Sequence, residues 1–515
     1  MESKVSGYGR NQKDSGMEWK LSQVFGERAS LEKVTDVDVI STIQFDKTGD
    51  FLAVGDHGGR LILFERVYAK PPYSREELER SNGAATSVLP RYTYLTEIQS
   101  HEPEIDHLYS LEIEEKINKL RWCPTLNNSL FILSTNNRTI KLWKIRNRKV
   151  KRVKEMSLNA HVSSENALLS ENSFAAGQDG QFVPNSFQID WIDKKYKLLS
   201  TEFREKRAMI INNMKATSRC RRIYTHAHEY NVNSISINSD GETFISADNL
   251  RVNLWNLEIS SQCFNIIDIK PPNMEDLIEV ITTAEFHPTY CNLLAYGSSR
   301  GFIRLVDMRT SALCDQSARI LHARENPPSS SFFSGIVKSI SDIKFGVGGM
   351  QVLSRDYMNL KLWDLRMEKS PVLSFKVHEH LRPKLAELYN NDSVFDKFEC
   401  CLSADEFHFA TGSYSNTFKV FSCDAGNSEG IILEASKNPN RRMVNVGQTA
   451  HKSRSWINFA RSINHRDVEG SNSNFDNEVR FPCDTTSKLT HMAWHPTRNL
   501  IACAAANSIY MMGYT

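Results

Sequence analysis

The 515-residue chain has no excess of charge of either sign and no long hydrophobic run. It carries 63 basic and 61 acidic residues, whereas nucleic-acid binders normally show a clear basic excess. No stretch approaches the roughly 18 apolar residues that cross a bilayer, and the first 20 residues lack the apolar core of a secretion signal. We therefore expect that the protein binds neither nucleic acid nor membranes. We expect it in the cytoplasm, and in the nucleus as a further location.

The chain also lacks the usual signatures of catalysis and metal binding. Its ten cysteines form no C-x-x-C pair, which gives a zinc site little support. There is no G-x-S-x-G elbow, no H-E-x-x-H helix and no phosphate loop, because the glycine pair after His57 lacks the lysine of that motif. The sequence predicts no catalytic residue, no cofactor and no metal.

Two pairs of histidines are separated by one residue, His226 with His228 and His378 with His380. On a strand, residues at this spacing share one face. A metal would need further ligands near them, and the sequence does not offer these. The pattern therefore favours hydrogen-bonded structural histidines.

A unit of three short strands recurs seven times along the chain. In the clearest copy, alternating apolar residues are separated by the turns Asn238–Gly241 and Asp248–Asn249, and the last strand ends near Trp255. The copies span residues 40–65, 117–144, 232–258, 281–307, 340–364, 398–421 and 489–512.

Such a unit has two faces to bury and open edges, so it is poorly stable alone. Radial packing buries both faces of every copy, whereas a β-sandwich accommodates seven similar units poorly. We therefore predict an all-β, seven-bladed propeller. A fourth, outer strand is expected from the segment after each unit, and residues 19–25 are expected to complete the last blade and close the ring.

The predicted propeller occupies residues 18–515 as one domain, after a flexible N-terminus of residues 1–17. Three insertions between units are long, at residues 66–116, 145–231 and 422–488. Long unpatterned segments in a compact fold are usually functional loops or disordered. The third is rich in Asn, Ser and Arg, and we expect it to be partly disordered.

Charge is patterned in two places. Residues 141–154 are densely basic, which indicates either a nuclear-targeting or partner-docking segment or a solvated strand end. Acidic residues also stand in or next to the predicted turns. If the radial repeat brings these turns to one face of the propeller, that face would be negative and would attract basic partners. Otherwise they are scattered, solvated carboxylates. They are Asp36, Asp38, Glu112, Glu114, Glu115 and Asp248.

Several long motifs carry a resemblance to a known family. They are FLAVGDHGGRLILF (51–64), SHEPEIDHLYSLEIEEKINKLRW (100–122), HAHEYNVNSISINSDGETFISADNLRVNLWNLEI (226–259), SSFFSGIVKSISDIKF (330–345) and VHEHLRPKLAELYNNDSVFDKFECC (377–401). With these motifs the chain resembles the regulatory B subunit of protein phosphatase 2A, the WD-repeat class. RYTYLTEIQSHEPE (91–104) and IACAAANS (501–508) make it similar to plant members.

The resemblance implies a non-catalytic subunit that joins a scaffold subunit and a catalytic subunit in a heterotrimer. It also implies that phosphoserine and phosphothreonine proteins dock on an acidic groove across one face of the propeller. The positions that match the family's docking residues are Asp36, His57, Glu114, Glu115, Lys116, Tyr230, Asn231, Asp248, Asn249 and Leu277.

The chain departs from the family pattern at several points. The family usually has two aspartates at Asp248-Asn249, a lysine at His57, and an acidic residue or threonine at Gly335. Residues 203–220 do not show the alternating strand and prolines of the family's scaffold-gripping arm. Two alternatives remain: an adaptor in another assembly, such as a ubiquitin-ligase receptor, or a divergent copy that no longer joins the phosphatase.

Overall fold

A computed structural model describes residues 19–26, 35–67, 89–106, 111–126, 129–149, 214–314, 318–323, 332–367, 370–423, 430–437, 439 and 484–514. The predicted N-terminus 1–17 lies outside these ranges. The chain divides into two compact units, residues 1–145 with 218–515, and residues 146–217. Of the smaller unit, only residues 146–149 and 214–217 are described, so the account below concerns the larger one.

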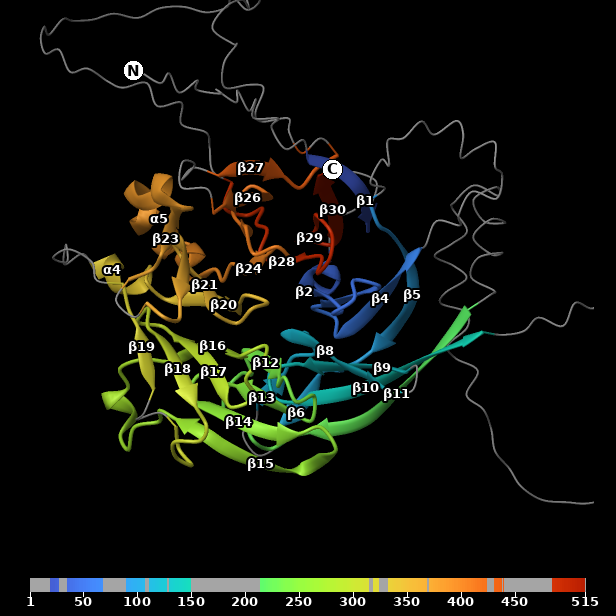
Figure 1. Ribbon diagram of the computed structural model, residues 1–515, viewed down its shortest axis with the longest axis horizontal. Coiled ribbons are helices and arrows are strands. Elements are labelled where there is room, and N and C mark those ends of the chain that lie inside the picture. Colours follow the sequence, from blue (N-terminus) through green and yellow to red (C-terminus); the bar gives the residue numbers. More distant parts are fainter. Residues whose placement is uncertain are drawn as a thin grey trace, which may run out of the picture. The chain divides into compact units, whose positions relative to one another are not determined.

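Seven four-stranded antiparallel sheets form the larger unit, and together they make a β-propeller (Figure 1). The predicted fold class is therefore confirmed. The first three blades are β2 (Ile40–Phe45), β3 (Phe51–Asp56), β4 (Arg60–Val67) and β5 (Arg91–Gln99); β8 (Lys119–Leu126), β9 (Ser129–Thr135), β10 (Ile140–Lys149) and β11 (Met214–Tyr224); and β12 (Ser234–Ile237), β13 (Thr243–Ala247), β14 (Arg251–Asn256) and β15 (Ile259–Asp268).

The remaining blades repeat this order of strands. They are β16 (Ile281–Phe286), β17 (Leu293–Ser298), β18 (Ile303–Asp307) and β19 (Arg319–Leu321); β20 (Ile340–Phe345), β21 (Gln351–Asp356), β22 (Asn359–Asp364) and β23 (Leu373–Lys376); β24 (Cys400–Leu402), β25 (His408–Gly412), β26 (Thr417–Ser422) and β27 (Ile431–Glu434); and β28 (His491–Trp494), β29 (Leu500–Ala505) and β30 (Ser508–Tyr514) with β1 (Trp19–Phe25).

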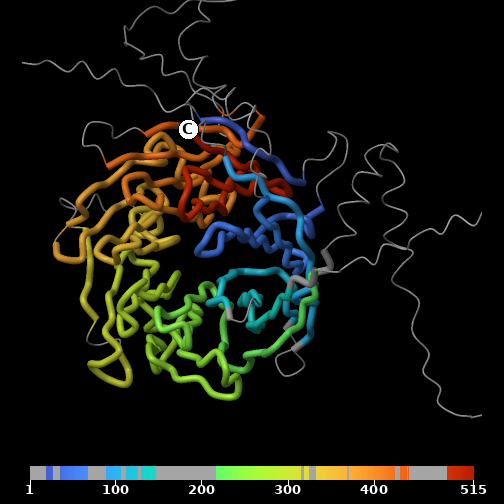
Figure 2. The backbone as a smooth tube through the Cα atoms, turned by 45° about the vertical axis from the view of Figure 1, so that its right-hand side comes forward, coloured from blue at the N-terminus to red at the C-terminus, as the bar shows by residue number. Residues whose placement is uncertain are grey.

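Strand β1 completes the last blade, as the sequence predicted. It pairs antiparallel with β30, placing Trp19 opposite Tyr514, so that the two ends of the ring share one sheet (Figure 2). The indole of Trp19 is 1% exposed. Its ring centroid lies 4.9 Å from that of Tyr514, 6.2 Å from Trp494 and 6.4 Å from Phe418. The closing strand is therefore anchored in the core shared by the last two blades.

The predicted outer strands come from the connecting segments, including parts of the long insertions. Strand β5 lies within residues 66–116, β11 within 145–231 and β27 within 422–488. Residues 214–220, the end of the segment that lacked the family's arm pattern, belong to β11, the fourth strand of the second blade. Within the described ranges, no helix has the length and apolar character needed to cross a membrane.

Two histidines fasten neighbouring blades by the same arrangement. His495 Nε2 lies 3.2 Å from the carbonyl oxygen of Gly49, while its Nδ1 accepts a bond from Thr497 N at 3.1 Å. His287 does the same with Gly349 O and Tyr290 N, both at 3.0 Å. A Cβ on Gly49, whose φ is +76°, would lie 2.2 Å from the His495 ring. Only glycine fits there, and each imidazole is held in its neutral form with the proton on Nε2.

Acid is expected to weaken the fold through His495. Burial lowers the pKa of His495 to about 4, below its ordinary value, so the unfolded chain binds more protons as the pH falls from 6.5 to 4. When the pH is lowered from 7 to 5, we expect the protonation of His495 in the unfolded chain to lower the free energy of unfolding by about 2 kcal/mol. Denaturant titrations at both pH values measure this. In His495→Asn, whose side chain does not titrate, the loss should be smaller, and an equal loss would contradict the assignment.

Candidate functional site

One end of the propeller collects the segments that lead into the innermost strands. Because the strands of each blade alternate in direction, these segments lie at the same end as the turn between the second and third strands. Hydrogen bonds join the two, from Gly58 N to Val37 O at 2.9 Å and from Ile281 N to Asn249 O at 2.7 Å. We call this end the upper face. Its segments include η1 (Asp36–Asp38), residues 114–116 and 228–231, η2 (Met274–Asp276), α4 (Phe332–Ile336), η3 (Glu379–Lys384), α5 (Leu385–Asn390), η4 (Ser393–Phe395) and residues 484–488.

All ten predicted docking positions stand on this upper face, in the leading segments or in the turns. Their exposure differs. Asp36, Glu114 and Asn231 are exposed, Asp248 is buried, and the other six are partly buried: His57, Glu115, Lys116, Tyr230, Asn249 and Leu277. The structure places these residues on one side of the ring, and their part in docking stays a prediction.

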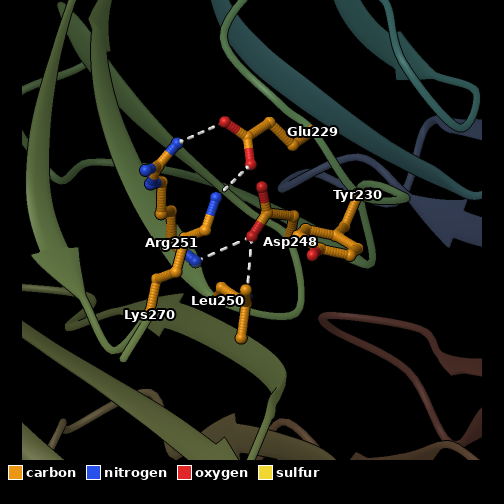
Figure 3. Close-up of a pocket in the computed structure, with 6 residues that line it drawn as sticks. All are labelled: Glu229, Tyr230, Asp248, Leu250, Arg251 and Lys270. Atoms are coloured by element: carbon orange, nitrogen blue, oxygen red, sulfur yellow. Dashed lines mark hydrogen bonds and ion pairs between the residues drawn. The ribbon is translucent and has the colours of Figure 1, made fainter. Parts of the chain in front are cut away.

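A shallow surface depression brings two of the predicted residues, Tyr230 and Asp248, together on the third blade. It is lined by Glu229, Tyr230, Asp248, Leu250, Arg251 and Lys270 (Figure 3). The phenol ring of Tyr230 lies beside Asp248, and Glu229 projects over the opening toward the two cations. The segment before β12, the turn before β14 and the segment after β15 therefore build the walls.

An ion-pair network controls the charge of this depression. Glu229 binds Lys270 Nζ at 2.8 Å and Arg251 Nη1 at 3.2 Å, and its side chain remains 51% exposed. The hydrogen bond from Lys270 lowers the pKa of Glu229, and the charge of Arg251 adds to the effect. Arg251 also binds Asp268 at 2.9 Å. Glu229 is thus an ionised, exposed carboxylate that is paired with Arg251 and Lys270 in this structure.

Asp248 forms part of the fold rather than an open carboxylate. Its Oδ1 accepts bonds from Leu250 N and Arg251 N, both at 2.7 Å, and its Oδ2 lies 2.9 Å from His228 Nδ1. The chain of bonds continues from His228 Nε2 to Ser246 Oγ at 2.6 Å, and Trp255 Nε1 donates to the same oxygen at 2.8 Å. Four side chains from four parts of the blade are thereby linked: the segment before β12, β13, the turn after β13, and β14. Asn249, partly buried beside them, is the accessible member of the turn.

A second group of predicted residues meets where the first and second blades adjoin. Ile117 N donates to Asp56 O at 3.1 Å, and His57 N donates to Val39 O at 2.9 Å, so the turn after β3 contacts both leading segments. Burial lowers the pKa of His57 to about 4, and the charge of Lys116 contributes. At neutral pH, His57 is therefore an uncharged imidazole where the family usually has a lysine.

The acidic residues of the predicted turns are partly neutralised. Arg60 Nη2 lies 2.7 Å from Asp38 and 2.6 Å from Asp56, both on the upper face. Asp36, Glu112 and Glu114 are exposed and form no ion pair among the described residues. Asp38 is thus already paired, whereas Asp36, Glu112 and Glu114 remain exposed.

An exposed aromatic cluster was missed by the sequence reasoning. The ring of Phe332 in α4 lies 5.6 Å from Tyr389 in α5, and Tyr389 lies 5.8 Å from Phe395 in η4. Phe332 is 69% exposed and Phe395 53%. The aromatic residues at 332 and 333, in a segment leading to an inner strand, were the available signal. Large exposed aromatic groups are enriched where proteins bind one another.

The expectation that each histidine pair shares a strand face is wrong: His226 and His228 lie in the segment before β12, and His378 and His380 lie at the start of η3. One member of each pair, His228 and His378, is a buried, hydrogen-bonded group. His228 bonds Asp248 and Ser246, as described above, and His378 Nε2 lies 3.0 Å from Ser413 Oγ. Within the described ranges, no three His, Cys, Asp or Glu side chains gather closely enough to hold a metal ion.

Comparison with known proteins agrees with this architecture. The family described as WD domain, G-beta repeat matches residues 218–256, which contain the His228–Ser246–Trp255 chain of hydrogen bonds. The fold and this match define the chain as a WD-repeat β-propeller.

Relatives of known name extend over almost the whole chain. Two plant proteins are each 53% identical and cover 96% of this chain, and both are 55 kDa regulatory B subunits of serine/threonine protein phosphatase 2A: the alpha isoform from Oryza sativa subsp. japonica, matched over 84% of its own length, and the beta isoform from Arabidopsis thaliana, matched over 96%. The regulatory B subunit of protein phosphatase PP2A from Schizosaccharomyces pombe is 42% identical over 97% of this chain and 98% of its own. The chain belongs to the family of 55 kDa regulatory B subunits of protein phosphatase 2A, and it resembles the plant members.

Proposed function

We propose that this protein is a non-catalytic subunit that binds a scaffold subunit and a catalytic subunit of the phosphatase and docks phosphoprotein substrates on its upper face. The observation that supports this most directly is the gathering of all ten predicted docking positions on one end of the ring. The chemistry of dephosphorylation then belongs to the catalytic subunit.

The contribution of a docking subunit is proximity. A substrate held on the propeller is present at a high effective concentration near the active site of the catalytic subunit. The encounter between its phosphorylated side chain and that active site therefore becomes effectively intramolecular. Glu229 supplies an ionised carboxylate for a basic substrate residue, and the cluster of Phe332, Tyr389 and Phe395 supplies apolar area. Together these favour substrates that combine basic and hydrophobic side chains.

Restoring the second carboxylate of the turn should strengthen docking. In Asn249→Asp, a partly buried position beside the depression gains a negative charge, and we expect basic peptides to bind about 2–5-fold more tightly, the range of a partly exposed ion pair. Fluorescence anisotropy with a labelled Arg-rich peptide measures this, with Asn249→Gln as the neutral control. Unchanged affinity in Asn249→Asp would place the docking contact elsewhere.

Assembly is the test of the proposed function. The purified chain is mixed with preformed scaffold–catalytic heterodimer and analysed by size-exclusion chromatography with mass detection. We expect a stable ternary peak with one copy of each subunit. Separate elution at micromolar concentration would overturn the proposal and would favour the divergent-copy alternative.

A further inference from the structure

The end of the propeller opposite the upper face carries the turns between the first and second strands of each blade, and we call it the lower face. Three consecutive blades expose large apolar side chains in these turns: Tyr290 after β16, Val347 and Met350 after β20, and Phe407 after β24. Their exposed fractions run from 41% to 67%. The same turns of the first, third and seventh blades consist of polar, charged, Gly and Pro residues, at 46–50, 238–242 and 496–499. The apolar residues therefore mark one sector of the lower face.

Direct contacts join these three turns into one surface. His287 Nε2 lies 3.0 Å from Gly349 O, which links the turn after β16 to the turn after β20. Gly348 N donates to Glu406 Oε1 at 2.6 Å, which links the turn after β20 to the turn after β24. The ring of Tyr290 lies 4.8 Å from that of His287. Because the bonded residues contact or directly neighbour the exposed apolar ones, the apolar side chains of the three blades form one adjoining group.

Two arginines of the same local geometry stand at this end of the fourth and fifth blades. Arg309 follows β18 and binds Asp307, and Arg366 follows β22 and binds Asp364. In both pairs Nη2 lies 2.6 Å from Oδ2 and Nε lies 3.0 Å from Oδ1. The arginine side chains are 69% and 71% exposed, whereas those of the aspartates are 26% and 15% exposed. Each guanidinium is therefore fixed by a carboxylate beneath it and faces solvent.

Backbone bonds place each arginine beside the apolar turn of its own blade. The residue before Arg366 donates from its backbone N to Met350 O at 2.9 Å, and the residue before Arg309 donates to Asn292 O, also at 2.9 Å. Met367, which follows Arg366, is 55% exposed. The sector thus combines aromatic, Met and Arg side chains, the residue types that are enriched where proteins bind one another.

We propose that this sector of the lower face binds a short, acidic, amphipathic segment of a further partner protein. The apolar side chains of the segment pack on the exposed apolar turns, because adjoining exposed apolar groups mark interaction sites. Its carboxylates bind Arg309 and Arg366, whose guanidinium groups are already oriented for paired hydrogen bonds. Asp405 is exposed in the turn of the sixth blade, so the acidic end of the segment lies over the fourth and fifth blades.

The size of the sector favours a single segment over a whole subunit or a second copy of this chain. A stable interface between folded subunits takes about 20–30 residues from each side, whereas the sector offers only a handful of large side chains from three blades. Such a partner would not compete with substrates on the upper face. The inference concerns the opposite end of the ring and does not rest on the proposed function.

The experiment selects peptides from a phage-displayed library of helical sequences on the immobilised full chain. The selected peptides are then synthesised with a fluorescent label and measured by anisotropy against the wild type and its variants. We expect a class of peptides that combines Asp or Glu with Leu, Ile or Phe. In Arg366→Glu and in Val347→Ser, these peptides should bind tenfold more weakly or worse, about 1.4 kcal/mol. Both positions are exposed, so the fold should be unaffected.

Two controls separate this sector from the rest of the surface. Arg498→Glu makes the same change of charge in the exposed lower-face turn of the seventh blade, and Glu229→Gln changes the upper face. Both should bind the acidic peptides as tightly as the wild type. Selected peptides that are all basic, or an affinity that survives Arg366→Glu and Val347→Ser, would overturn the proposal. An equal loss in Arg498→Glu would reduce it to a general effect of charge and would overturn it as well.

Size-exclusion chromatography with mass detection tests the other occupants of the sector. We expect the chain alone to elute as a monomer, and Arg366→Glu to enter the complex with the scaffold–catalytic heterodimer as the wild type does. A wild-type dimer that dissociates in Val347→Ser would assign the sector to a second copy of the chain. Entry of the wild type but not of Arg366→Glu would assign it to the phosphatase subunits. Either result would overturn the further partner, whereas the peptide experiment needs no phosphatase subunit and is independent of the assembly test.

Discussion

Replacing Trp19 with alanine is expected to lower the free energy of unfolding by about 3–5 kcal/mol. The indole is 1% exposed and contacts aromatic rings from two blades, those of Phe418, Trp494 and Tyr514. Its loss leaves a cavity beneath β1, the strand that joins the two ends of the ring. Guanidinium titration followed by circular dichroism measures the change.

The matched control for Trp19→Ala is Phe264→Ala on β15, where the ring is 66% exposed. Substitution of an exposed residue typically changes stability by about 0.5 kcal/mol or less. If both variants unfold at the same denaturant concentration as the wild type, β1 does not close the propeller in solution.

Replacing Asp248 with alanine is the second change with a large expected effect. The carboxylate is 1% exposed and accepts bonds from two backbone N–H groups as well as contacting His228. Its removal leaves all three buried groups without their partner, and breaking a buried polar network of this kind costs about 3–5 kcal/mol. Thermal and chemical unfolding of the purified variant measure the loss.

Asp276→Ala provides the comparison for Asp248→Ala, because Asp276 is an exposed carboxylate on the same upper face. We expect its stability to stay within about 0.5 kcal/mol of the wild type. Wild-type stability in Asp248→Ala, combined with weaker binding of a basic peptide, would instead show that Asp248 acts only in docking.

The fold could be predicted because the propeller repeats a local pattern. Alternation over a few residues reports which face of a strand is buried, and seven copies of one pattern leave few architectures that bury them all. The closing strand was predictable for the same reason, since residues 19–25 alternate and the last copy lacked an outer strand. Met214–Tyr224 lacks clear alternation of apolar and polar residues. For that reason the sequence did not show that this particular segment is β11.

The chemistry of the upper face depends on partners far apart in the sequence, and periodicity carries no information about them. Glu229 meets Lys270 only because β15 returns to the upper face. Lys119 on β8 meets Glu399, which directly precedes β24 and is 280 residues away in the chain. Asp248 looked like an available carboxylate in a turn, and only the bond to His228 from the preceding segment shows that it is enclosed.

The central claim, that this protein acts by docking substrates, is tested most directly by phosphatase kinetics. The value of kcat/KM of the scaffold–catalytic heterodimer is measured with and without this chain, on an intact phosphorylated protein and on a small aryl phosphate. We predict that the chain raises kcat/KM for the protein substrate by tenfold or more, about 1.4 kcal/mol of binding, and leaves the aryl phosphate unaffected. An equal change for both substrates, or no change for the protein, would contradict the account.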